Sequence, residues 1–172
     1  MRKIISIVLL CLIISSVFVG CGKQPVEQAQ TSQTAMIGNP WSDWASIEEA
    51  EAAVGFSFEL PEMIADSYTA VVFRTLNNEM IEIIYRDEEF EVCVRKQKGE
   101  GQDISGDYNQ YDTCTEETVG EGTIIHYSNS GSNAVKQLIS CKGFSWSLVA
   151  ADGYWGDSNQ DFLSKILDQP LP

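Results

Sequence analysis

The sequence predicts an α+β domain, in which an antiparallel β-meander has one helix before it and one after it. Three features of the chain predict this fold. A capped amphipathic segment comes first, a series of alternating segments separated by turn residues follows, and a second amphipathic segment comes last. Because such alternation is typical of antiparallel strands with one packed face, we expect about seven or eight strands, with both helices on the packed face.

The first helix is predicted over Ile47 to Val54, where apolar residues recur at helical spacing. Ser46 and Glu49 have the spacing of a capping box, in which the serine hydroxyl accepts a hydrogen bond from the Glu49 amide. Gly55 supplies a left-handed residue at the other end.

After this helix the apolar period changes to two. Phe56 to Leu60 alternates apolar and polar residues, which predicts a first strand. The next two strands meet at Asn77-Asn78, because paired asparagines tolerate the positive φ of a tight hairpin. The predicted strands after the first are Tyr68 to Thr75, Glu79 to Arg86, Phe90 to Arg95, and about Tyr111 to Thr118, Thr123 to Ser128, Ala134 to Cys141 and Phe144 to Ala151.

A final helix is predicted from Asp157-Ser158 to just before Pro170. Its apolar face consists of Phe162, Leu163, Ile166 and Leu167.

The N-terminus has the features of a secretory signal. Arg2 and Lys3 precede an apolar run from Ile4 to Val19 that is too short to span a membrane comfortably. Phe18-Val19-Gly20-Cys21 resembles a lipobox, in which the Cys21 thiol takes a diacylglycerol by thioether linkage. We therefore expect a signal peptide over residues 1–20 and lipid attachment at Cys21. A plain secretory signal and an uncleaved anchor helix are the alternatives.

Residues 21–39 are rich in Gln, Thr, Ser and Ala and show no apolar periodicity, so they predict a lipidated, disordered tether. Residues 40–172 are predicted to form a single domain of ordinary globular composition, since 44 % of the chain is hydrophobic. The chain has 25 acidic residues against 11 basic ones and a formal net charge of −14, which argues against nucleic-acid binding.

Candidate chemistry is sparse, and no catalytic residue, cofactor or metal site is predicted. His126 is the single histidine, and the sequence contains neither a G-x-S-x-G elbow nor a C-x-x-C pair. The preferred surface for binding is instead a polar loop, because loops held on a rigid sheet often carry function. This candidate interaction loop consists of Asp103, Ile104, Ser105, Gly106, Asp107, Tyr108 and Asn109. An ordered connection without a binding role is the alternative.

Three cysteines remain in the predicted domain, so one internal disulfide is the most it can form. Cys93 and Cys114 flank the long loop. If their strands are neighbours, the two residues lie opposite each other at a distance that a disulfide can bridge. Cys141 is two strands further along a meander. We therefore expect a Cys93–Cys114 disulfide, with three reduced cysteines as the alternative.

Four signals occur in order along the chain. They are the lipobox, Asn-Pro-Trp with a capped helix leading to Gly55-Phe56-Ser57-Phe58-Glu59-Leu60-Pro61, the strand Glu79-Met80-Ile81-Glu82-Ile83-Ile84-Tyr85, and Val94-Arg95-Lys96 leading to the candidate loop. Together they resemble small lipoproteins of Firmicutes with a domain of unknown function, which also occurs in the extracytoplasmic regions of anti-sigma-factor-like proteins. The resemblance covers about Asn39 to Leu167. It implies a lipid-anchored, non-catalytic module at the cell surface and supplies no catalytic residue.

The expected function is therefore that of an interaction or sensory module on the extracytoplasmic face of the cell membrane, held there by the lipid on Cys21. Its partner would be an envelope protein or a small ligand. One alternative is a carrier that binds a lipid or cell-wall fragment in a cavity under a curved sheet. A second alternative is an envelope hydrolase with paired carboxylates such as Asp103 and Asp107, one of which would need a raised pKa.

Overall fold

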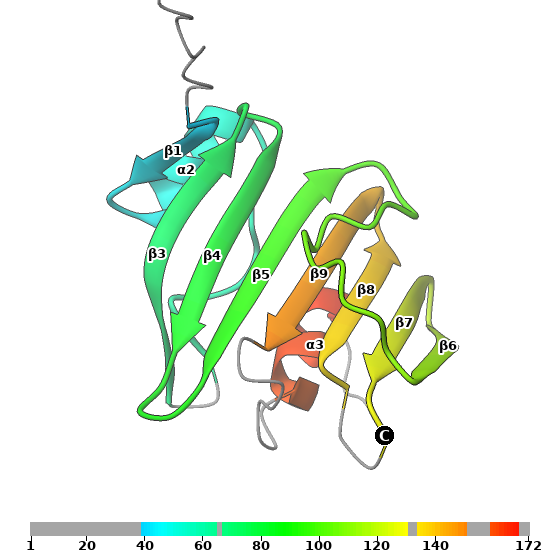
Figure 1. The fold of residues 1–172 in the computed structure, drawn as a ribbon. Coiled ribbons are helices and arrows are strands. Elements are labelled where there is room, and N and C mark those ends of the chain that lie inside the picture. Colours follow the sequence, from blue (N-terminus) through cyan, green and yellow to red (C-terminus); the bar gives the residue numbers. More distant parts are fainter. Residues whose placement is uncertain (1–38, 65–66, 131–133, 151–158, 169–172) are drawn as a thin grey trace, which may run out of the picture. The chain divides into compact units, whose positions relative to one another are not determined.

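A nine-stranded antiparallel sheet with two helices makes up the computed structural model, which describes residues 39–64, 67–130, 134–150 and 159–168 (Figure 1). The predicted antiparallel α+β fold is confirmed. The helices are α2 (Ile47–Val54) and α3 (Asn159–Leu167). The strands are β1 (Trp41–Trp44), β2 (Met63–Ile64), β3 (Tyr68–Leu76), β4 (Met80–Arg86), β5 (Glu91–Lys98), β6 (Thr113–Val119), β7 (Gly122–Ser128), β8 (Lys136–Cys141) and β9 (Phe144–Ala150).

Helix α2 begins and ends as predicted. The Glu49 amide donates to Ser46 Oγ at 3.4 Å, and the Glu49 carboxylate accepts from the Ala45 amide at 3.1 Å. Gly55 ends the helix in the left-handed region with φ 72°. Both ends of α2 are therefore specified by local side-chain and backbone chemistry.

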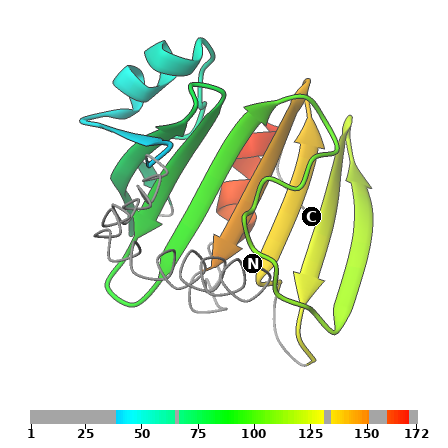
Figure 2. The same ribbon diagram turned by 45° about the horizontal axis from the view of Figure 1, so that its top comes forward.

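The order of strands across the sheet is β1-β3-β4-β5-β9-β8-β7-β6, and β2 also pairs with β3. The chain therefore forms two meanders, β3-β4-β5 and β6-β7-β8-β9, and joins them through β5 and β9. The strands therefore do not form one continuous meander, in which each strand would pair with the next one along the chain. The connection from β5 to β6 instead crosses β9, β8 and β7 to reach the far edge (Figures 1 and 2).

One face of the sheet packs against both helices in a single hydrophobic core. The fully buried Phe162 of α3 packs edge-on against Tyr68 and Tyr85, with ring centroids 5.6 and 5.3 Å apart. Trp146 of β9 packs against Phe58, at 5.4 Å between centroids. Burial of large side chains of this kind is the main source of stability in a domain of this size.

The strand predicted over Phe56 to Leu60 is wrong. Phe58 and Leu60 are buried as the alternation implied, but the segment pairs with no strand in the described part of the chain. Its Glu59 has φ 69°, in the left-handed region, which interrupts an extended strand. The Phe58 amide donates to the Glu51 carboxylate of α2 at 2.6 Å, so a helix side chain satisfies this backbone group.

Several predictions for the ends of the chain lie outside the described residues. They include the signal peptide, Cys21 and all of the tether except Asn39, as well as Asp157, Ser158 and Pro170. Neither described helix has the length and hydropathy that a membrane-spanning helix requires.

Candidate binding site

The connection from β5 to β6, residues 99–112, is named the strap here, because it lies across the face of the sheet opposite α3 (Figure 2). The candidate interaction loop predicted from the sequence is its middle part. Backbone amides at the start of the strap donate to serine side chains of the sheet. Gly101 donates to Ser140 Oγ at 2.9 Å, and Gln102 donates to Ser145 Oγ at 3.0 Å. The strap is therefore hydrogen-bonded to β8 and β9 beneath it.

An arginine–glutamate cluster fastens the next part of the strap. Glu82 of β4 is fully buried and accepts hydrogen bonds from Arg74 and from Arg95 Nε, the latter at 2.6 Å. Arg95 also donates from Nη1 to the Ile104 carbonyl at 2.9 Å. The Trp41 ring lies over both guanidinium groups, 4.5 and 5.5 Å from its centroid. The two arginines thus compensate the buried charge of Glu82 under the strap, and the Trp41 ring packs against their guanidinium groups.

The polar side chains of the strap form successive turns. Asp103 Oδ1 accepts from the Ser105 amide at 3.0 Å, and Ser105 Oγ accepts from the Asp107 amide at 3.1 Å. Asp107 accepts from the Asn109 amide at 2.9 Å and from the Tyr111 hydroxyl. These bonds replace a regular ladder with side-chain turns, as Asp, Asn and Ser commonly do.

Lys136 of β8 is buried below the strap. Its Nζ lies 3.4 Å from Asp103 Oδ2 and 3.2 Å from the Asp107 carbonyl oxygen, and 4.4 Å from the centroid of the Tyr127 ring. Burial alone would raise the pKa of Asp103 and of Asp107. Hydrogen bonds from Ser105, Tyr111 and Asn109 together with the Lys136 charge outweigh burial, so the pKa of both carboxyls lies below its usual range.

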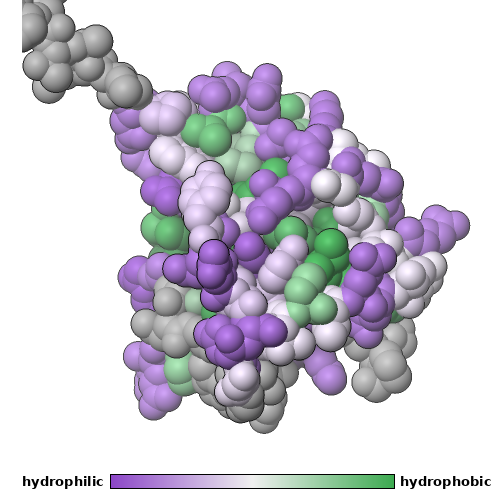
Figure 3. Space-filling view, turned by 45° about the vertical axis from the view of Figure 1, so that its right-hand side comes forward, coloured by the Kyte–Doolittle hydropathy of each residue, from purple (hydrophilic) through white to green (hydrophobic). Residues whose placement is uncertain are grey.

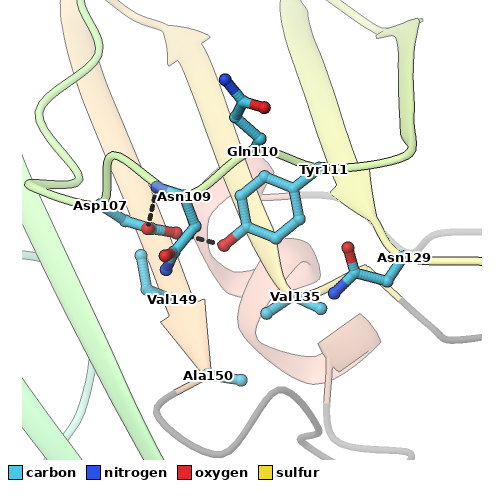
Figure 4. Close-up of a pocket in the computed structure, with 8 residues that line it drawn as sticks. All are labelled: Asp107, Asn109, Gln110, Tyr111, Asn129, Val135, Val149 and Ala150. Carbon is cyan, nitrogen blue, oxygen red and sulfur yellow. Dashed lines mark hydrogen bonds between the residues drawn. The ribbon is translucent and has the colours of Figure 1, made fainter.

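A pocket of about 370 Å³ opens where the strap meets the ends of β8 and β9, and it is named the strap pocket (Figure 4). Figure 4 shows the carboxamides of Asn109 and Asn129 on two sides of this space and the ring of Tyr111 between them. Apolar side chains form its floor. The described lining residues are Asp107, Asn109, Gln110, Tyr111, Asn129, Val135, Val149 and Ala150.

The residues predicted as an interaction loop divide between two roles. Ile104 and Ser105 are buried, while Gly106 lies against the Arg95 guanidinium, so these three hold the strap on the sheet. Asp107 and Asn109 line the strap pocket, and Tyr108 is 95 % exposed. The sequence pattern gave no sign that Asn129, Val135 and Val149 belong to this site, because only the strand order brings β7, β8 and β9 beside the strap.

The predicted Cys93–Cys114 disulfide is wrong. Cys93 lies on β5 and Cys114 on β6, and the three strands β9, β8 and β7 separate them in the sheet. Four strand spacings are about 19 Å, several times the Cα separation of a disulfide. Cys93, Cys114 and Cys141 are all free thiols. Burial and the nearby Glu82 raise the pKa of Cys93 to about 12, so this thiol is protonated at neutral pH.

His126 of β7 is held by two neighbours. Its Nε2 lies 3.0 Å from Glu117 Oε1, and its Nδ1 lies 2.9 Å from Gln137 Nε2. Neither neighbour is a serine, threonine or cysteine. Within the described ranges, no group of three or more His, Cys, Asp or Glu residues is arranged to hold a metal ion.

No protein-family model, curated protein or solved structure matches the chain.

Proposed function

We propose that this chain is a lipid-anchored, non-catalytic binding module on the extracytoplasmic face of the membrane, and that the strap pocket is where it binds a small polar molecule. The strap pocket is the observation that supports this function. A cross-sheet strap held by buried charges provides a rigid rim, and rigid scaffolds with loops of this kind are typical of binding sites.

The lining of the strap pocket favours an uncharged ligand. Asp107 is the only residue with a formal charge among its described lining residues, and the carboxamides of Asn109, Gln110 and Asn129 both donate and accept hydrogen bonds. Val135, Val149 and Ala150 suit the C–H surface of a small ring. The acidic chain as a whole repels anions. A hydroxyl- or amide-bearing molecule such as an amino sugar derivative fits these properties.

A titration followed by the backbone amide signals of the isotope-labelled chain tests this ligand class. The probes are N-acetylglucosamine, acetate and octanoate. We expect N-acetylglucosamine alone to shift the signals of Asn109, Tyr111 and Val135, and Asn109→Ala to weaken that response about tenfold. Gln160→Ala on α3 is the matched control, because it removes an exposed carboxamide on the other face. Absence of a response to N-acetylglucosamine contradicts the proposed ligand class.

The carrier alternative needs a cavity under the sheet, on the side of the helices. In the described residues that side is filled by aromatic side chains such as Phe58, Trp146 and Phe162. Octanoate is the probe for this alternative, since an acyl chain would shift the signals of these core residues. The hydrolase alternative needs a carboxyl with a raised pKa, whereas the pKa values of Asp103 and Asp107 are both lowered.

Lipid attachment is tested by growing cells that express the chain with labelled palmitate. We expect the full-length chain to incorporate label and to sediment with membranes, and Cys21→Ala to lose both properties. Cys11→Ala is the control, since this cysteine lies within the predicted signal peptide. Equal labelling of Cys21→Ala and the parent chain contradicts the assignment of the anchor.

A further inference from the structure

Strand β6 ends the sheet on the side away from β1. It pairs with β7 along its whole length from Thr113 to Val119, and in the described part of the chain no strand lies on its other side. Six of its seven residues are exposed. Figure 3, which brings this side of the sheet forward, shows hydrophilic residues surrounding a small hydrophobic area.

The register of the β6–β7 hairpin identifies the backbone groups at the open edge. Val119 and Gly122 close the turn at Gly120-Glu121, and residues that close such a turn bond to each other. Because bonded and non-bonded pairs alternate in an antiparallel ladder, the backbone N–H and C=O groups of Thr118, Glu116 and Cys114 point away from β7.

β6 has few of the common protections of a sheet edge. Edges are usually blunted by charged side chains, lysine above all, by proline, by a bulge or by short length, and β6 has only its two glutamates. The register of β6 is unbroken through all its pairs, and its sequence Thr-Cys-Thr-Glu-Glu-Thr-Val contains neither lysine nor proline. The opposite end of the sheet differs, because β1 has only four residues.

The charges of β6 determine which kind of strand can pair favourably with its open edge. Glu116 lies opposite Ile125 and Glu117 lies opposite Ile124, so the two faces of the edge each carry a carboxylate. Antiparallel pairing of the whole of β6 with a second copy places Glu116 of one chain opposite Glu116 of the other, which is unfavourable. A strand with lysine or arginine at these positions instead gains opposite-charge pairs across the ladder.

We propose that β6 binds an extended, basic segment of another protein, which adds to the sheet as the strand after β6. Backbone hydrogen bonds to Cys114, Glu116 and Thr118 supply affinity, and Glu116 and Glu117 supply selectivity for a basic segment. This surface lies on a different strand from the strap pocket residues, so it is independent of the proposed function.

Binding of fluorescent blocked peptides to the full-length chain in neutral detergent tests the proposal. The first peptide alternates lysine with valine over the length of β6. The second has glutamate in place of lysine, and the third is the lysine peptide with a central proline, which cannot form a continuous ladder. We expect only the first peptide to bind and to slow alkylation of the exposed Cys114.

Two sets of variants distinguish addition of the peptide as a strand from non-specific attraction of a basic peptide to an acidic chain. Glu116→Pro removes an outward N–H that the β6–β7 ladder does not use, so we expect a folded chain that binds the lysine peptide about tenfold more weakly. Joint reversal by Glu116→Lys and Glu117→Lys is expected to transfer binding to the glutamate peptide. Glu88→Lys with Glu89→Lys is the matched control, because it makes the same change of net charge in the exposed turn between β4 and β5.

The proposal is overturned if the proline peptide binds as tightly as the lysine peptide, or if the control reversal weakens binding as much as the reversal on β6. It is also overturned if no peptide binds, or if the chain forms dimers that Glu116→Pro dissociates. Should Glu116→Pro fail to fold, the outcome of the joint charge reversal decides alone.

Discussion

Arg95 Nη1 donates a hydrogen bond to the carbonyl oxygen of Ile104 at 2.9 Å, while its Nε bonds to Glu82 at 2.6 Å. One side chain thus joins a buried carboxylate of the sheet to the backbone of the strap. The position of the strap pocket depends on this link, because Asp107 and Asn109 follow Ile104 closely along the chain.

Replacing Gly106 tests the close approach of the strap to Arg95. A Cβ at Gly106 would lie 2.3 Å from Arg95 Nη1, and φ is 65°. Gly101 also has positive φ, at 75°, but no atom lies within 4 Å of its Cβ position. We expect Gly101→Ala to cost about 1 kcal/mol, the penalty of a left-handed alanine, and Gly106→Ala to cost about 2–3 kcal/mol. Urea unfolding measures the free energy of unfolding of both variants. Equal losses of stability in Gly101→Ala and Gly106→Ala would contradict the close approach of Gly106 to Arg95.

Acid should weaken the strap through Asp103 and Asp107. Their folded-state pKa values lie below the ordinary 3.8, so they add stability that is present above that pH and is lost as pH falls through the folded-state values. We expect the free energy of unfolding of the parent chain to fall more steeply below pH 4 than that of Asp103→Asn with Asp107→Asn. Asp87→Asn, outside the strap, is the control variant. Parallel curves for the parent chain and the double variant would disprove this linkage.

Lys96 should also make stability rise with pH, but in the alkaline range. Its side chain is 1 % exposed and bonds to the Ser57 carbonyl oxygen at 2.6 Å and to Glu59 at 3.2 Å. Burial lowers its pKa from 10.5 despite the charge of Glu59. Between the lowered value and 10.5 the unfolded chain binds more protons than the folded chain, so stability rises with pH.

The comparison with Lys96→Met isolates this effect from other titrating groups. We expect the stability of the parent chain relative to Lys96→Met to increase as pH rises towards 10.5. Lys98→Met removes an exposed lysine of the same strand and should show no such trend. Unfolding free energies measured between pH 7 and pH 10.5 decide the matter, and a pH-independent difference for Lys96→Met refutes the linkage.

Thiol reactivity should distinguish the three cysteines of the domain. In the chain with Cys11→Ser and Cys21→Ser, we expect iodoacetamide to modify Cys114 rapidly, because it is exposed. Cys141 is buried, and the pKa of Cys93 is raised to about 12, so both should react only after denaturation. Mass spectrometry of peptides counts the modified sites. Finding a Cys93–Cys114 disulfide would contradict the strand order.

Local elements of this fold were predictable from the sequence because their signals are local. Ser46, Glu49 and Gly55 specify α2 through bonds within a few residues. The turns after Leu76 and Cys141 also appear in the sequence, and their residues Asn77, Asn78 and Lys142 have positive φ. In contrast, the alternation at Phe56 to Leu60 correctly predicted which side chains are buried but wrongly predicted that the segment pairs with another strand. A buried extended segment and a strand both have an apolar period of two, so the pattern does not distinguish them.

The strand order and the site required information that a sequence pattern does not contain. A connection as long as the strap allows β5 to pair either with the next strand along the chain or with a later one. The pairing of β5 with β9 therefore follows only from packing of the whole sheet. Glu82 and Lys96 are charged residues on opposite faces of the sheet, and nothing in their strand patterns predicts that both are buried. Glu82 lies beneath the strap and Lys96 beneath the Phe56–Leu60 segment.

The strap also determines when the sheet can be completed as the chain folds. β3, β4 and β5 are joined by short turns, so they can form early during synthesis, before the later strands are available. The neighbour of β5 on its other side is β9, the last strand, and Arg95 pairs with Ser147 across a long stretch of chain. The centre of the sheet is therefore assembled last, and until β9 arrives β5 presents an unpaired edge to other nascent chains. A variant with a lengthened strap should fold more slowly, while a chain cut within the strap should yield two fragments that recombine along β5 and β9.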